Sequence, residues 1–183
     1  MPEIFVLSGL GSSVVSYFRK GTDEIDRILD EMTGNQSETL VWNKWEDVVE
    51  AIKGKDPKKV IIIFVGHSNG VYGCMSAARE LGLLGFVVHY IAAIDPTLKP
   101  FPKAGANILH IDEFHASSGG VSFVRGLFKI VRLWTGRIKK SPDFQGTHKI
   151  KKIRGGHVGI VSDPKLQSII KNKVSEILAD NSH

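Results

Sequence analysis

The sequence predicts a three-layer α/β/α sandwich built on a mostly parallel sheet of about six strands. Short apolar runs of strand length alternate along the chain with longer segments whose apolar residues recur at helical spacing. This alternation is typical of parallel sheets, because a parallel strand must be reached through a crossover, which is usually a helix. The candidate reactive residues directly follow the expected strands, so we expect them at the carboxyl edge of the sheet.

Length and composition favour one domain. The 183 residues can bury a core of their own, and we interpret residues 1–183 as a single domain of ordinary composition, 42% apolar and 23% charged. The one cysteine, Cys74, excludes an internal disulfide and a cysteine-rich zinc site. The first residues, MPEIFVLSGLG, lack the positive charge of a signal peptide, and no run approaches the roughly 20 apolar residues of a membrane span. A cytoplasmic location is therefore expected.

The individual elements follow from the apolar pattern and from turn residues. Strands are expected at residues 4–7, 39–42, 60–65, 86–94, 107–111 and 149–153, and helices at 14–32, 45–52, 69–81 and 164–178. Gly21 interrupts the first helical segment, so a break is expected there. The last helix has the clearest beginning, since Asp163 is a good N-cap and Pro164 suits the first helical position.

The central strand runs directly into a glycine-flanked serine. Residues 60–70 read VIIIFVGHSNG, and a helix-compatible segment follows. A sharp turn from strand to helix strains the backbone of its middle residue and requires small residues on either side. Gly66 and Gly70 meet this requirement and leave the hydroxyl of Ser68 at the apex. The segment therefore predicts a nucleophilic serine.

A serine hydroxyl needs an adjacent base and an acid that orients the base. His157 is the expected base, because it lies among glycines directly after the last strand and before the last helix. Two residues are candidates for the acid. Asp95 is favoured, because it ends a strongly apolar strand and precedes Pro96, which defines the turn. Asp112, at the end of the next expected strand, is the alternative.

Backbone N–H groups should stabilise the oxyanion of an acyl-transfer reaction. The N–H of Asn69, next to Ser68, is one expected donor, and the N–H of Leu10, in the loop after the first strand, is the other. The spacing of this loop matches neither common phosphate-binding motif. The histidines of residues 110–115 likewise match no metal-ligand spacing, so no cofactor and no metal are expected.

With GHSNG at residues 66–70, the loop at 8–13 and a late Gly156-His157 in this order, the sequence resembles the α/β-hydrolase superfamily. More narrowly, it resembles small lipase, esterase and thioesterase-like members that lack the first strands of the full fold. The resemblance spans residues 4–178 and implies these roles: nucleophile for Ser68, general base for His157, orienting acid for Asp95 or Asp112, and oxyanion donors for Leu10 and Asn69.

A basic and apolar segment lies between the last two expected strands. Residues 122–134 read SFVRGLFKIVRLW, with Arg125, Lys129 and Arg132 along one helical face. Such a segment can be an ordinary covering helix, part of a cap over the site within residues 114–142, or a contact to an anionic membrane surface through residues 122–140. No nucleic acid is expected as a partner, since no stacking residues interleave with the basic ones.

The leading hypothesis from the sequence is a serine hydrolase that cleaves a small-molecule carboxylic ester or thioester with an apolar acyl group. The reaction would pass through an acyl intermediate on Ser68. A peptidase or amidase on the same scaffold is one alternative. The other is a binding module without catalysis that docks on an anionic membrane surface or an acidic partner.

Overall fold

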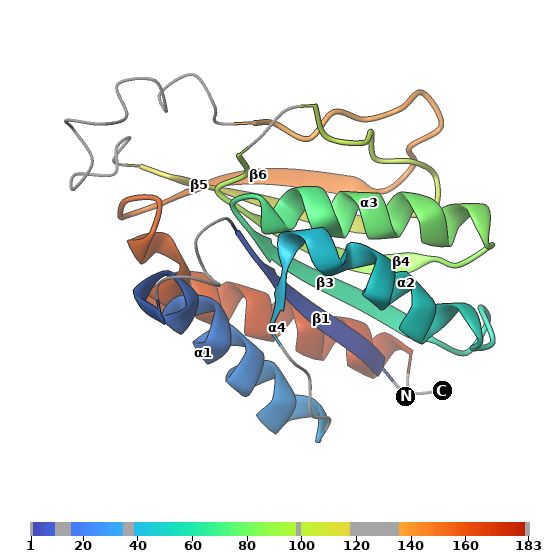
Figure 1. Cartoon of the computed structure of the whole chain (residues 1–183), viewed down its shortest axis with the longest axis horizontal. Helices are drawn as coiled ribbons and strands as arrows, with labels where there is room; N and C mark the ends of the chain where they lie inside the picture. Colours follow the sequence, from blue (N-terminus) through green and yellow to red (C-terminus); the bar gives the residue numbers. More distant parts are fainter. Residues whose placement is uncertain (1, 10–15, 35–38, 98–99, 118–135, 182–183) are drawn as a thin grey trace.

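The computed structural model describes residues 2–9, 16–34, 39–97, 100–117 and 136–181 of the chain (Figure 1). Within these ranges, six strands form one fully parallel sheet in the order β2-β1-β3-β4-β5-β6. The strands are β1 (Pro2–Ser8), β2 (Leu40–Val41), β3 (Ile61–His67), β4 (Val88–Ile94), β5 (His110–Ala116) and β6 (Thr147–Ile153). The expected mostly parallel sheet of about six strands is confirmed.

Helices cover both faces of this sheet. Helices α2 (Trp45–Lys53) and α3 (Gly70–Leu83) pack on one face, and α1 (Ser16–Thr33) and α4 (Pro164–Asp180) pack on the other (Figure 1). Side chains alternate along each strand: in β3, Ile62 and Phe64 join the first core, whereas Ile63 and Val65 join the second. Because both faces are covered, the central strands are apolar on both sides, which is why they read as continuous apolar runs.

The helices follow the sequence closely, with one exception. Asp163 caps α4, since its carboxylate accepts hydrogen bonds from the N–H groups of Lys165 and Leu166 at 2.9 and 3.0 Å. The break expected at Gly21 is wrong, because α1 continues from Ser16 to Thr33. An internal glycine costs a helix only about 1 kcal/mol, and burial of Ile25 and Leu29 against the sheet offsets it.

None of the helices that the structure describes combines the length and the apolar character needed to cross a membrane.

The fifth strand differs most from its expected position. β5 begins three residues later and ends five residues later than the expected strand at 107–111. Its register places Ile111 beside Ile91 and Phe114 beside Ile94 of β4. The two acidic residues between them, Asp112 and Glu113, make a strand improbable from composition alone, but both carboxylates are buried with hydrogen-bond partners. Asp112 therefore lies inside a strand, and its expected place at a strand end is wrong.

A close approach of the backbone explains the second glycine of the GHSNG segment, Gly70. A Cβ atom added to Gly70, the first residue of α3, would lie 1.9 Å from the carbonyl oxygen of Leu7 in β1. We expect Gly70→Ala to push α3 away from the sheet and to lower the free energy of unfolding by about 3 kcal/mol or more, measured by urea denaturation.

The matched control is Gly54→Ala. Gly54 follows α2 with a φ of −87°, and an added Cβ would meet nothing within 4 Å. This variant should unfold close to the wild-type midpoint. Equal stability of the two variants would contradict the proposed close contact.

Candidate active site

Ser68 occupies the turn between β3 and α3, at the carboxyl edge of the sheet. Its φ is +57°, a left-handed conformation that is strained for a residue with a side chain, and the residue is 8% exposed. Its N–H donates to the carbonyl of Ile94 at 2.9 Å, which fixes the turn to the neighbouring strand. A Cβ added to Gly9 would lie 2.7 Å from the Ser68 Cβ, so the chain leaving β1 passes directly beside this serine.

The structure brings three residues distant in sequence into one hydrogen-bonded row. His157 Nε2 lies 3.0 Å from the Ser68 Oγ, and His157 Nδ1 lies 2.6 Å from the Asp95 Oδ2. An ionised carboxylate can only accept hydrogen bonds, so Nδ1 carries the proton that faces Asp95. In the neutral ring, Nε2 is then left with a lone pair directed at the serine hydroxyl. This arrangement can take a proton from Ser68.

Asp95 is held at the end of β4 in an unusual backbone conformation. Its φ is +42°, its N–H donates to the carbonyl of Phe114 at 2.7 Å, and its Oδ1 accepts from the N–H of Ala116 at 3.2 Å. Burial by itself raises the pKa of this carboxyl, but the hydrogen bond from His157, the charge of that ring and the Ala116 N–H together lower the pKa below its ordinary value. Asp95 is therefore ionised at neutral pH.

The alternative acid lies elsewhere. Asp112 accepts a hydrogen bond from the Tyr90 hydroxyl at 3.3 Å and from the Lys151 ammonium at 3.2 Å. Its neighbour Glu113 points to the opposite face of the sheet, as expected for successive strand residues. Of the two carboxylates considered from the sequence, Asp95 contacts His157, and Asp112 is engaged by Tyr90 and Lys151 instead.

His67, the residue before Ser68, makes a long-range contact that its place in the motif does not reveal. Its Nε2–H donates to the backbone carbonyl of His157 at 2.9 Å, and the two rings lie 4.9 Å apart. Burial, followed by the charge of His157, lowers the pKa of His67 to about 4. The ring is thus neutral at neutral pH, and its hydrogen bond connects the His157 loop to the turn that contains Ser68.

Thr97 is a second residue that the sequence does not single out. Its Oγ1 lies 2.7 Å from the Ser68 Oγ and 2.7 Å from the Asn69 Oδ1. It belongs to the Asp95-Pro96-Thr97 turn, so one turn carries both the acid and this hydroxyl. A polar residue two positions after a candidate acid is the only signal in the sequence, and it is too common to be informative.

A cluster of polar side chains around Glu113 lies next to Asp95. Glu113 is fully buried, and its carboxylate accepts from His115 at 2.6 Å, from His148 at 2.8 Å and from the Ile138 N–H at 3.2 Å. Burial raises the pKa of Glu113, but these hydrogen bonds outweigh it and lower the pKa to about 2. His115 Nδ1 lies 3.9 Å from the Asp95 Oδ1, so this cluster adjoins the row of Ser68, His157 and Asp95.

Two parts of the expected site lie largely or wholly outside the described residues. Leu10, the second expected oxyanion donor, is one of them, whereas Asn69 is described as the N-cap of α3. Residues 118–135, which include most of the expected cap and most of the basic segment, are the other. Among the residues that are described, no three His, Cys, Asp or Glu side chains gather in a way that could hold a metal ion.

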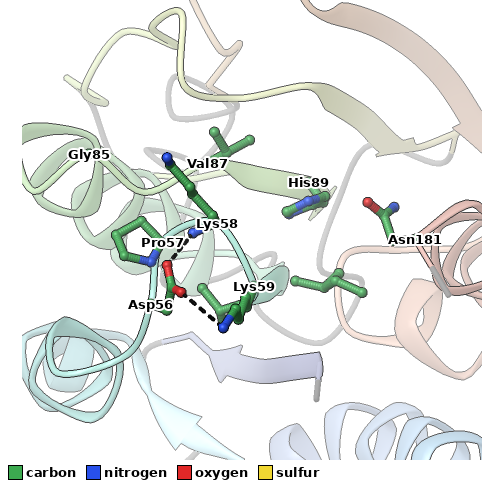
Figure 2. A pocket seen from close by; sticks show the side chains of 10 residues that line it. Asp56, Pro57, Lys58, Lys59, Gly85, Val87, His89 and Asn181 are labelled. Atoms are coloured by element: carbon green, nitrogen blue, oxygen red, sulfur yellow. Dashed lines mark hydrogen bonds and ion pairs between the residues drawn. The ribbon is translucent and has the colours of Figure 1, made fainter. Parts of the chain in front are cut away.

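A cavity of about 870 Å³ lies at the opposite edge of the sheet, near the beginnings of β3 and β4 (Figure 2). Lys59 and Asp56 form an ion pair of 3.6 Å at its rim, as the dashed line in Figure 2 indicates. The residues that line it are Asp56, Pro57, Lys58, Lys59, Val60, Ile61, Gly85, Val87, His89 and Asn181. Since this set contains no member of the Ser68 row, the cavity is separate from the candidate active site.

Solved structures of other proteins share this architecture. A protein of Xanthomonas campestris pv. campestris assigned to the alpha/beta superfamily of hydrolases aligns with a TM-score of 0.60 and 11% identity, over 94% of this chain and 98% of the other. Human thioesterase 2 aligns with a TM-score of 0.57 and 15% identity, over 100% of this chain and 98% of the other. No protein-family model and no curated protein matches the sequence. At these identities the comparison shows the fold, which is that of a small α/β-hydrolase-like protein.

The burial of neutral His67 predicts a specific loss of stability in mild acid. Its pKa is about 4 in the folded protein and about 6.5 in the unfolded chain, so the unfolded chain takes up the proton first. Unfolding therefore becomes more favourable as the pH falls, by about 2 kcal/mol from this group between pH 6.5 and 4.5. His67→Gln keeps an N–H donor but does not titrate, so urea midpoints should depend less on pH in this variant. An unchanged pH dependence would contradict the assignment.

Proposed function

We propose that the protein is a serine hydrolase that cleaves a carboxylic ester or thioester. The observation that carries this proposal is the hydrogen-bonded row from Ser68 through His157 to Asp95 at the carboxyl edge of a parallel sheet. The α/β-hydrolase-like fold of the two structural neighbours, one of which is a thioesterase, supports hydrolysis as the class of reaction.

In the proposed first step, His157 Nε2 takes the proton of the Ser68 hydroxyl while Oγ attacks the carbonyl carbon of the substrate. Asp95 keeps the imidazole ring oriented through its Nδ1–H and stabilises the positive charge that the ring acquires. The Asn69 N–H, at the N-terminus of α3, is the proposed donor to the developing oxyanion. His157 then gives the proton to the leaving alcohol or thiol, and an acyl group stays on Ser68.

In the second step, water replaces the leaving group. Neutral His157 takes a proton from water as the water oxygen attacks the acyl carbon, and it returns the proton to Ser68 Oγ as the acid departs. His67 does not titrate with His157 in this cycle, because its pKa of about 4 keeps it neutral. It can therefore hold the His157 backbone throughout the reaction.

We propose an ester or thioester as the substrate in preference to an amide, because of the leaving group. Alcohols and thiols leave more readily than amines, which require full protonation before the bond breaks. An apolar acyl group and a contact of residues 122–140 with an anionic membrane surface stay predictions of the sequence. Of that segment, Arg137, Lys139 and Lys140 are described and exposed.

A fluorophosphonate probe tests the nucleophile directly. We expect covalent labelling of the wild-type protein at Ser68, together with hydrolysis of p-nitrophenyl esters, and we expect Ser68→Ala to abolish both. The site of labelling is read by mass spectrometry of the digested protein. A folded wild-type protein that is not labelled would favour the alternative of a binding module without catalysis.

The two acids can be compared in matched variants. Asp95→Asn removes the charge that orients His157, so kcat/KM should fall by about three orders of magnitude or more. Asp112→Asn removes a carboxylate that contacts Tyr90 and Lys151, so it should change stability but leave most of the activity. Full activity of Asp95→Asn together with loss of activity in Asp112→Asn would reverse the assignment.

A further inference from the structure

The Ser68 hydroxyl has two hydrogen-bond partners but only one proton. His157 Nε2 lies 3.0 Å from its oxygen, and Thr97 Oγ1 lies closer, at 2.7 Å. Thr97 Oγ1 in turn donates to the Asn69 side-chain oxygen at 2.7 Å. The row that begins at Asp95 therefore continues past the nucleophile to Thr97 and Asn69. The mechanism above uses neither of these two side chains.

Two arrangements of protons make every contact in the row a hydrogen bond. When His157 is neutral, Ser68 donates to Nε2, so the Ser68–Thr97 contact requires that Thr97 donates to the Ser68 oxygen. The Thr97 oxygen can then accept from the Asn69 amide, because rotation of the amide by 180° exchanges its oxygen and nitrogen without moving Thr97. Each residue then donates to the next one: Asn69 to Thr97, Thr97 to Ser68, and Ser68 to His157.

The second arrangement is the reverse of the first. When His157 carries protons on both nitrogens, Nε2 donates to Ser68, Ser68 donates to Thr97, and Thr97 donates to the Asn69 side-chain oxygen. The direction of the row is thus coupled to the protonation of His157. Only the first arrangement, with neutral His157, can begin catalysis, and in it Thr97 is a hydrogen-bond donor to the nucleophile.

We propose that Thr97 is a further catalytic residue of the serine hydrolase inferred above, whose hydroxyl donates a hydrogen bond to the Ser68 oxygen as Ser68 gives up its proton. In this step the Ser68 O–H bond breaks, the proton goes to His157 Nε2, and an electron pair of Oγ forms the bond to the carbonyl carbon. Thr97 keeps its own proton. The donated hydrogen bond stabilises the negative charge that develops on Oγ before the new bond is complete.

Backbone hydrogen bonds and the turn after β4 also position Thr97. The left-handed conformation of Asp95 reverses the chain at the end of β4, and Pro96 fixes the next φ. The Pro96 carbonyl accepts from the Gly136 N–H at 2.8 Å, and the Thr97 N–H lies 3.4 Å from the Ser68 carbonyl. The turn that directs the carboxylate to His157 therefore also directs the Thr97 hydroxyl to Ser68.

Two variants of Thr97 separate the effect of its hydroxyl on the reaction rate from the effect of its shape. Thr97→Val has nearly the same volume but no donor, whereas Thr97→Ser keeps the donor and loses a methyl group. We expect the rate of fluorophosphonate labelling of Ser68, and kcat for a p-nitrophenyl ester, to fall about tenfold to a hundredfold in Thr97→Val. Thr97→Ser should stay within a few-fold of wild type, and thermal melting of both variants should confirm that they fold.

A variant of the Asn69 side chain provides a second test of the row. In Asn69→Asp the side chain can only accept, so it should draw the Thr97 proton away from Ser68 and slow labelling. In the Thr97→Val background the new carboxylate still repels the developing oxyanion, but no hydroxyl is left to redirect, so the same substitution should slow labelling by a smaller factor than in the wild-type background. Independent effects that multiply in the double variant would overturn the proposed row.

The outcomes distinguish this inference from the function on which it rests. Wild-type protein that is not labelled at Ser68 overturns the serine hydrolase and the role of Thr97 with it. Ser68-dependent labelling at the wild-type rate in folded Thr97→Val overturns the role of Thr97 alone. Equal losses in the valine and serine variants also overturn it, since they would show that the shape of Thr97 matters rather than its hydroxyl.

Discussion

The contact of β1 with the turn that contains Ser68 is the constraint on which the rest of the candidate site depends. Gly70 lets α3 begin against the Leu7 carbonyl, where an added Cβ would lie only 1.9 Å away. This close approach holds Ser68 in a left-handed conformation at the edge of the sheet. Because the turn is fixed from both sides, residues from other strands can meet one defined oxygen atom rather than a mobile side chain.

Polar groups around this turn are buried, and each one described is held by a neighbour. Asp95 has His157 and a backbone N–H, Glu113 has two histidines, and neutral His67 donates to a carbonyl. A buried group without a partner costs free energy, so such a network permits few alternative arrangements. Ser68 and Asp95 both have a strained left-handed backbone, and they lie at the ends of the adjacent strands β3 and β4. Backbone strain of this kind is typical of functional sites.

The apolar pattern of the sequence predicts the parallel sheet correctly, but it does not predict the bounds of β5. Continuous apolar runs predict buried parallel strands, and the sheet confirms them. In β5 the pattern misleads, because Asp112 and Glu113 lie inside the strand and are stabilised by side chains from β4 and β6. Local composition cannot indicate such partners, since Tyr90 and His148 are distant in sequence.

The sequence by itself determined the alternation of elements and the turn at Ser68, because both depend on periodicity and on glycines a few residues apart. It also placed His157 and Asp95 after strands, and so at one edge of a parallel sheet, whereas it placed Asp112 wrongly, since Asp112 lies inside β5. The tertiary structure decided which carboxylate meets the imidazole, and it brought His67 to the His157 carbonyl and Thr97 to Ser68. Those contacts depend on strand register and on the left-handed turn at Asp95, which are properties of the packed chain and not of any short segment.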